Sequence, residues 1–165
     1  FVFEGVVETI KELSKKYKVC IVSNCQGGYI ELTMKALGIE KYITDFECPG
    51  YTDLPKGENC KLVMERNGFQ SAIYVGDTQG DCDAASFAEI PFVFCEYGFG
   101  EVDRFDYSIK KFPELLELFK KINSTPLRFR GVVPKRAKNS SSLIACHSSA
   151  DISRGSNKGL NASLR

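Results

Sequence analysis

The sequence predicts an α/β fold of the Rossmann-like, three-layer type, in which a parallel sheet lies between two layers of helices. Short apolar runs rich in β-branched residues alternate with segments of helical periodicity, the order that gives parallel strands. The runs 18–23 and 71–76 are almost entirely apolar, which is typical of strands buried on both faces. The chain has 165 residues, 43% of them hydrophobic, enough for one domain with a proper core.

Each element is predicted from its periodicity and its end signals. Gly38 and Gly68 supply C-terminal stops for two of the helices. Pro113 stands in the first turn of the last helix, where its missing N–H costs nothing. The predicted helices are 6–17, 28–37, 57–67, 81–88 and the segment from 113, and the predicted strands are 18–23, 42–48, 71–76 and 91–95.

The charge distribution divides the chain at residue 123. Residues 1–123 carry 14 Lys and Arg against 20 Asp and Glu, a net charge of −6. Residues 124–165 carry 8 basic residues and one acidic residue, a net charge of +7, and nine serines. Because periodicity also stops at this point, we expect 1–123 to form the folded core and 124–165 to be a disordered tail or a segment foreign to the domain. With one aromatic residue and no motif, the tail does not favour nucleic-acid binding.

The cysteine and histidine content restricts both compartment and chemistry. Seven cysteines form no C-x-x-C pair, and several lie inside apolar runs, which favours a reducing, cytoplasmic location. The only histidine is His147, so histidine-based catalysis or zinc binding is not expected within 1–123. No apolar segment reaches membrane-spanning length.

Two predicted strands end in polar residues. Ser23 and Asn24 follow the first strand, and Asp77 and Asp81 follow the strand at 71–76. In parallel α/β sheets, ligands bind beyond the carboxyl ends of the strands. The two carboxylates are candidates for holding Mg²⁺, which binds oxygen ligands. An ordinary turn at Asp77 and a helix cap at Asp81 are equally compatible with the pattern, although residue 84 gives Asp81 no capping-box partner.

Two further residues have side chains suited to phosphate chemistry. Lys56 stands at a predicted helix start, where it is either solvated or faces a phosphate. Cys25 follows Asn24 near a helix N-terminus, which lowers thiol pKa. A cysteine phosphatase would need an Arg six residues later, and that residue is Glu31, so Cys25 is not expected to be the nucleophile.

The order of these motifs resembles the haloacid dehalogenase-like (HAD) phosphohydrolase superfamily, and within it the phosphoglycolate-phosphatase-like branch. "IVSN" (21–24) is similar to the second family motif, Lys56 to the third, and "VGDTQGDCDAA" (75–85) to the fourth. The resemblance runs from about Gly5 to Ile122. It implies Mg²⁺-dependent hydrolysis of a small phosphomonoester through an aspartyl-phosphate.

The resemblance also implies roles for individual residues. Ser23 and Asn24 would bind the phosphate, Lys56 would neutralise the phosphate and the nucleophile, Asp77 would hold Mg²⁺, and Asp81 would support the metal and Lys56. The expected partner is a small phosphorylated metabolite. Nothing in the sequence points to a membrane or fixes the oligomeric state.

The family's first motif, D-x-D-x-T/V after the opening strand, and the cap that follows it have no counterpart in this sequence. We therefore expect an N-terminally truncated core that is inactive by itself. The alternative is a non-catalytic phosphate-binding or interaction module. In the resembled fold the first-motif strand lies between the strands at 18–23 and 72–76, so its loss is expected to leave a gap there and an unstable sheet.

Overall fold

The fold of the protein is described from a computed structural model, which describes residues 3–124 and 141–145. These residues form a six-stranded sheet in the order β2-β1-β6-β3-β4-β5, and each pair of neighbouring strands is parallel. The strands are β1 (Lys18–Val22), β2 (Asp45–Glu47), β3 (Ser71–Gly76), β4 (Phe92–Cys95), β5 (Tyr107–Ile109) and β6 (Ser141–Ala145). The α-helices are α1 (Val6–Ser14), α2 (Tyr29–Leu37), α3 (Pro49–Thr52), α4 (Lys56–Arg66), α5 (Gln79–Phe87) and α6 (Leu115–Ser124), with 3₁₀ turns η1 (Glu40–Tyr42) and η2 (Phe112–Glu114).

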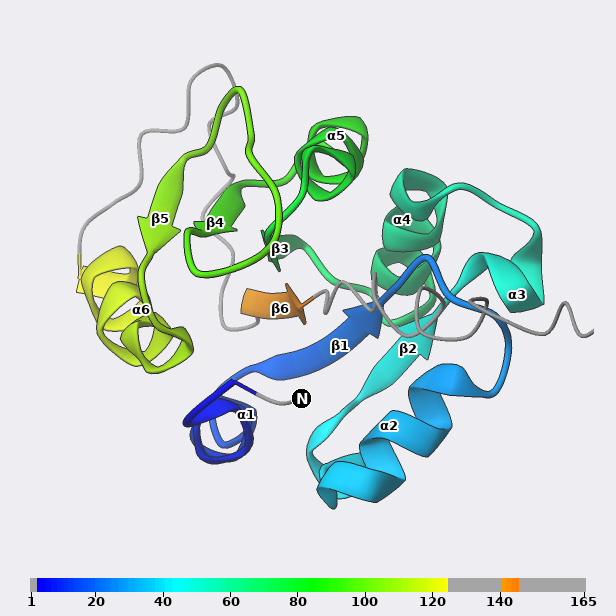
Figure 1. The fold of residues 1–165 in the computed structure, drawn as a ribbon, viewed down its shortest axis with the longest axis horizontal. Helices are drawn as coiled ribbons and strands as arrows, with labels where there is room; N and C mark the ends of the chain where they lie inside the picture. The colour runs from blue at the N-terminus through cyan, green and yellow to red at the C-terminus, as the bar shows by residue number, and fades with distance from the viewer. Residues whose placement is uncertain (1–2, 125–140, 146–165) are drawn as a thin grey trace, which may run out of the picture.

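Helices cover both faces of the sheet, as predicted. One hydrophobic cluster joins α1, α2 and α6 to the sheet, and a second joins α4 and α5 to its other face (Figure 1). Alternate residues of β1 contribute to opposite clusters, Val19 to the first and Cys20 to the second. Because successive side chains of a strand point to opposite faces, a nearly continuous apolar run is what a strand between two helical layers requires.

The central position of the sheet is filled by a segment of the predicted tail. β6 lies between β1 and β3 and is parallel to both (Figure 1). Ile144 is paired with Cys20 on one side and with Tyr74 on the other. Two predictions are therefore wrong for residues 141–145: these residues are not disordered, and β1 and β3 do not face a gap. The remainder of 125–165 lies outside the described residues.

The other predicted elements are confirmed with small shifts at their ends. The strand at 71–76 matches its prediction in full. The strand predicted at 42–48 is shorter: η1 includes residue 42, and β2 begins at Asp45 and ends at Glu47. The sequence reasoning missed α3 and β5, which are short. The last helix begins as the 3₁₀ turn η2 around Pro113 and continues as α6.

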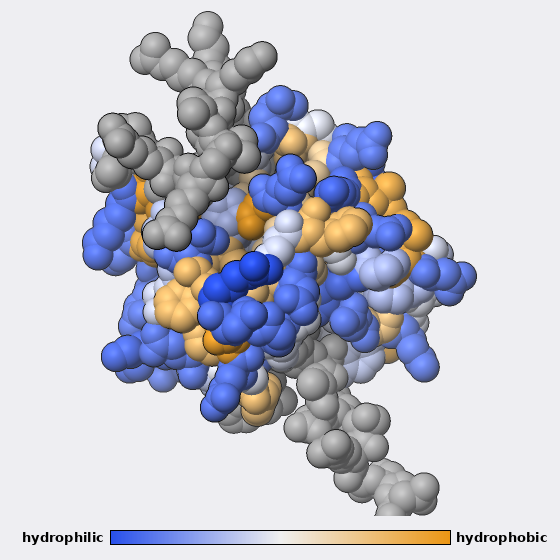
Figure 2. All heavy atoms as spheres, turned by 90° about the horizontal axis from the view of Figure 1, so that it is seen from above, coloured by the Kyte–Doolittle hydropathy of each residue, from blue (hydrophilic) through white to orange (hydrophobic). Residues whose placement is uncertain are grey.

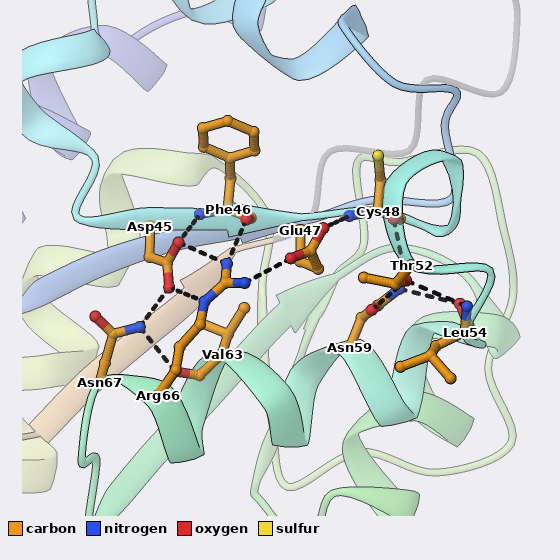
Figure 3. Close-up of polar contacts among 10 residues, drawn as sticks. All are labelled: Asp45, Phe46, Glu47, Cys48, Thr52, Leu54, Asn59, Val63, Arg66 and Asn67. Atoms are coloured by element: carbon orange, nitrogen blue, oxygen red, sulfur yellow. Dashed lines mark hydrogen bonds and ion pairs between the residues drawn. The ribbon is translucent and has the colours of Figure 1, made fainter.

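The short edge strand β2 is fastened to α4 by one arginine (Figure 3). The Arg66 guanidinium donates to both carboxylate oxygens of Asp45, at 2.6 and 2.7 Å, and to Glu47 Oε2 at 2.6 Å. It also donates to the Phe46 carbonyl at 2.7 Å. Burial would raise the pKa of Asp45, but the hydrogen bonds from Arg66 and Asn67 outweigh it and lower that pKa. Planar, bidentate contacts of this kind fix orientation as well as position.

The surface in Figure 2 is mostly hydrophilic, with hydrophobic residues in separate patches between the charged ones. The large apolar side chains that are exposed are Leu32, Tyr51, Phe87, Phe99 and Phe105. Among the described residues, no helix has the length and apolar character needed to cross a bilayer.

Candidate phosphate and metal site

The polar residues predicted to form a site lie at one edge of the sheet. Ser23 follows the last residue of β1, and Asp77 follows the last residue of β3. Both strands are parallel to β6, so their carboxyl ends lie at the same edge. Ser23 and Asp77 are 4% and 7% exposed, so both are held within the protein rather than in mobile solvent-facing turns.

Asp81 is fully buried and both of its oxygens accept hydrogen bonds. Oδ1 accepts from Lys56 Nζ at 2.7 Å and lies 3.3 Å from the Tyr74 hydroxyl. Oδ2 accepts from the backbone N–H of Asp77 and from the backbone and hydroxyl of Thr78, at 2.8 to 3.1 Å. The same Tyr74 hydroxyl lies 3.2 Å from the Val22 carbonyl at the end of β1. The Asp81 carboxylate therefore joins Lys56 of α4 and Tyr74 of β3 to the turn at 77–78.

Lys56 and Asp81 form a buried ion pair, with side chains 8% and 0% exposed. Burial would raise the pKa of Asp81, but the charge and hydrogen bond of Lys56 and the donors of Asp77 and Thr78 outweigh it and lower that pKa. Asp81 is thus an anion at neutral pH, and Lys56 is the cation that balances it.

Asp77 has a different environment from Asp81 and is held by the loop that follows β4. Its Oδ2 accepts a hydrogen bond from the Phe99 N–H at 2.9 Å, and Gly98 packs so closely that an added Cβ would lie 2.1 Å from the Asp77 Cβ. The loop at 97–100 thus clamps the carboxylate in place. Asp77 also lines a cavity of about 80 Å³ with Ile21, Tyr97 and other residues.

The carboxylates fit Mg²⁺ better than a metal that needs a complete protein cage. Within the described residues, no group of three or more His, Cys, Asp or Glu side chains is placed to hold an ion. Mg²⁺ keeps several waters and is bound through one or two carboxylates plus substrate phosphate. Asp77 follows β3 directly and is a candidate for contact with the ion, and Asp81 orients the turn behind it through the bonds that it accepts from the backbone of Asp77 and Thr78.

Asn24 and Lys56 open onto a common pocket. This pocket, of about 420 Å³, is lined by Asn24, Lys56, Gly80, Asp83 and Phe87 among others. It therefore connects the loop after β1 to the first turns of α4 and α5. Backbone N–H groups and the positive end of the helix dipole at such a helix start favour an anion.

A buried network fixes the turn that precedes Lys56 (Figure 3). Asn59 has no exposed surface, and its amide donates to the Leu54 carbonyl at 3.0 Å. The Thr52 hydroxyl lies 2.7 Å from Asn59 Oδ1 and accepts from the Leu54 N–H at 3.2 Å. These bonds close the segment between α3 and α4, so Lys56 begins its helix at a defined position.

The loop after β1 packs directly on α3. The Gly28 N–H donates to the Tyr51 hydroxyl at 2.6 Å, and Tyr51 also bonds to Glu31. Gly50 approaches so closely that an added Cβ would lie 2.1 Å from the backbone nitrogen of Gly27. That contact is with backbone, which has no rotamer to move aside.

We therefore expect Gly50→Ala to lower the free energy of unfolding by about 1–3 kcal/mol, the usual cost of overpacking. Gly80→Ala is the matched control, because its Cβ would meet nothing nearer than 3.8 Å and alanine favours the helix by about 0.5–1 kcal/mol. Urea unfolding of both variants gives the comparison. Equal stabilities for Gly50→Ala and wild type would contradict the close packing of the loop on α3.

Sequence reasoning missed the residue that caps α5. Thr78, not Asp81, is the N-cap: its hydroxyl accepts from the Asp81 N–H at 3.3 Å, and the Asp81 carboxylate accepts from the Thr78 N–H. The prediction that Asp81 takes part in no capping box is thus wrong, because Asp81 stands at position N3 of the box rather than at the N-cap. The T-x-x-D spacing at 78–81 was the signal for it. The role of Tyr74 had no signal, since a tyrosine in a buried strand looks like core.

Comparisons with known proteins agree with this architecture. The family model described as haloacid dehalogenase-like hydrolase matches residues 2–95, more than half of the chain. The chain thus belongs to the haloacid dehalogenase-like hydrolases. No curated protein matches it.

Several solved structures share the fold. A haloacid dehalogenase-like hydrolase from Streptococcus pneumoniae superposes with a TM-score of 0.66 at 22% identity, covering 71% of this chain and 59% of that one. A HAD phosphatase from Thermococcus onnurineus gives a TM-score of 0.64 at 23% identity, with coverage of 72% and 58%. The HAD hydrolase YfnB from Bacillus subtilis, solved with bound magnesium, gives 0.61 at 20% identity, with coverage of 73% and 55%. This chain thus spans less than two thirds of each of these proteins.

Proposed function

We propose that this chain is the phosphate- and Mg²⁺-binding part of a HAD-type phosphatase that hydrolyses a small phosphomonoester, of the phosphoglycolate-phosphatase-like branch. The observation that carries the proposal is the Lys56–Asp81 pair, 2.7 Å apart and buried beside Asp77 at the carboxyl edge of the sheet. An ion pair with a purely structural role would not need the Asp77 carboxylate fixed next to it by the Phe99 N–H. It would also not need Lys56 to line a pocket. We also propose a cytoplasmic location.

In this proposal each residue has one task. Ser23 and Asn24 bind phosphate oxygens, and Lys56 offsets the negative charge that the phosphate brings to a buried site. Asp77 holds Mg²⁺, which when bound would screen the charge of the phosphate group. Asp81 keeps Lys56 and the turn at Asp77 in position, through the bonds that it accepts from both.

The covalent route needs an aspartate nucleophile and a general acid two residues later. Asp81 and Asp83 are the only D-x-D in the sequence, and they open α5 instead of following a strand. A second candidate function is therefore a non-catalytic phosphate-binding module. Coding sequence upstream of Phe1 distinguishes the two: a D-x-D after an apolar strand favours the enzyme, and a full-length chain without one favours the module.

Binding of inorganic phosphate to the full chain, with and without MgCl₂, tests the site by isothermal titration calorimetry. We expect Mg²⁺ to strengthen phosphate binding. In the presence of MgCl₂, Asp77→Asn should weaken phosphate binding at least tenfold, since a hydrogen bond or contact to a charged group contributes roughly 1.5–3 kcal/mol. Lys61→Met is the control, because Lys61 lies on α4, the helix that Lys56 begins, with its Nζ 4.5 Å from the centre of the Phe87 ring. Identical titrations for Asp77→Asn, Lys61→Met and wild type would refute the proposed site.

The chain by itself is expected to release no phosphate from an aryl phosphate in the presence of Mg²⁺. A colorimetric phosphate assay measures this against a buffer control. Turnover that disappears in Asp77→Ala would place the nucleophile at Asp77 and contradict the roles given above.

A further inference from the structure

Two cysteines lie together at the carboxyl ends of the neighbouring strands β1 and β2. The register of β1 and β2 pairs Val22 with Glu47, and Cys48 directly follows Glu47, the last residue of β2. The Ser23 N–H donates to the Glu47 carbonyl at 3.2 Å, and the Gly50 N–H donates to the Cys25 carbonyl at 3.3 Å. The backbones that carry Cys25 and Cys48 are thus tied together on both sides of the pair.

The side chains of the two cysteines also belong to the same apolar cluster. Cys48 is fully buried, and Cys25 is half-buried against the same apolar cluster. Burial is the largest cause that raises the pKa of the Cys48 thiol, and the nearby Cys25, through its charge and a hydrogen bond, raises it further. Among the described residues, both cysteines are free thiols.

The other buried cysteines among the described residues are Cys20, Cys60, Cys82 and Cys95. Burial raises the pKa of each of these thiols, to about 12 for Cys20, Cys60 and Cys95, so little of the reactive thiolate is present at neutral pH. Cys25, by contrast, reaches the surface in the loop that follows β1. An oxidant from solvent therefore reaches the half-buried Cys25 before the fully buried Cys48.

We propose that Cys25 and Cys48 form a reversible disulfide when the protein meets hydrogen peroxide. The Cys25 thiolate attacks one peroxide oxygen, an S–O bond forms, the O–O bond breaks, and hydroxide leaves to give a sulfenic acid. The Cys48 sulfur then attacks the Cys25 sulfur, the S–S bond forms, and the S–O bond breaks. The oxygen leaves as water with the Cys48 proton. Two thiols lose two electrons, and one peroxide becomes two waters.

The disulfide would join the loop at Ser23 and Asn24 covalently to the start of α3. Asn24 lines the pocket that it shares with Lys56, so the redox state would set how far that side of the pocket can move. Disulfides in reducing compartments are usually transient and redox-sensing, which agrees with a pair that is free at rest. The inference does not depend on the phosphatase function.

Mass spectrometry of the native full chain tests the pair after treatment with hydrogen peroxide, alkylation of free thiols and digestion with trypsin. Trypsin releases Cys48 in peptide 42–56, and Cys25 in peptide 19–35 together with Cys20, from which fragmentation distinguishes it. We expect a cross-link between these peptides at Cys25 and Cys48 that dithiothreitol removes. Oxidation in urea should scatter the cross-links over several cysteines, because the native packing selects the pair.

Variants make the assignment specific. Cys25→Ser and Cys48→Ser should each abolish the cross-link, and Cys60→Ser should retain it. In Cys48→Ser, Cys25 should accumulate as sulfinic acid, since its sulfenic acid has no second thiol to attack it. Free Cys25 and Cys48 in native wild-type protein after peroxide treatment, or a cross-link through Cys20, would overturn the proposal without reference to any variant's folding.

Discussion

A chain shortened to residues 1–124 is expected to lose cooperative unfolding and to aggregate. It keeps every described element except β6, which pairs with β3 over residues 141–145 and with β1 over residues 142–145. Val19, Cys20 and Val22 of β1 are fully buried, so the backbone groups that face β6 would be left without partners in the interior. Each such group costs roughly 1–3 kcal/mol, against a whole-domain stability of about 5–15 kcal/mol. Loss of a few is therefore enough to unfold the domain.

Thermal denaturation followed by circular dichroism measures the effect. The matched control is the chain 1–146, which keeps β6, so the difference between the two truncations isolates the segment that contains it. In the full chain, Leu143→Pro should lower the melting temperature strongly, since proline removes a ladder N–H from a strand paired on both sides, whereas Leu143→Val keeps it. A 1–124 chain that melts cooperatively at the wild-type temperature would show that β1 and β3 do not need β6.

Lys56→Met is expected to lower the free energy of unfolding by about 3–5 kcal/mol, the usual result of leaving one member of a buried ion pair alone. Asp81 would remain a carboxylate without exposure to water. Lys120→Met is the control, because the Lys120–Glu117 pair is 68% and 66% exposed and such pairs contribute about 0–1 kcal/mol. Guanidinium unfolding at pH 7 gives both values, and equal losses for the two variants would contradict the buried pair.

The pH dependence of the same variant has a definite sign. The pKa of Asp81 is lowered in the folded protein, so its contribution is fully present above its unfolded pKa of about 3.9 and is lost as pH falls through the folded pKa. Lys56→Met removes the largest causes that lower this pKa, so its folded carboxyl takes up a proton more readily. The stability difference between wild type and Lys56→Met should therefore narrow as the pH falls from the folded pKa of Asp81 in the variant to its lower folded pKa in the wild type. A constant difference between pH 7 and pH 3 would mean that Lys56 does not stabilise the Asp81 anion.

Local sequence signals predicted most of this fold, because apolar runs, helical periodicity and end residues mark most of the elements around the site. The strand at 71–76 has an apolar run and sharp boundaries, and its ends match the structure. The placement of Ser23 and Asp77 at one sheet edge followed from parallel pairing alone. Asp81 was found from the sequence, but its bonds to Tyr74 and Thr78 depend on packing that periodicity does not report.

The strand β6 could not be predicted, because its strand conformation depends on partners that are distant in sequence. "SSLIA" has three apolar residues in a serine-rich, basic context, and its partners lie far away in sequence, in β1 and β3. Its conformation is decided by the two edges that it joins, because strand propensity depends strongly on the neighbours against which a strand packs. The sequence did point to the position between 18–23 and 72–76 as one that needs a strand, but it did not show which segment fills it.

Hydrogen–deuterium exchange on the full chain tests the central claim most directly, which is that β6 completes the sheet that carries the proposed phosphate site. Peptides that cover β1, β3 and β6 report the protection of each strand under native conditions. We expect slow exchange in all three strands, with residues 141–145 protected to the same degree as 18–22 and 71–76. Exchange of 141–145 at the rate of an unstructured peptide, beside slow exchange in β1 and β3, would contradict it.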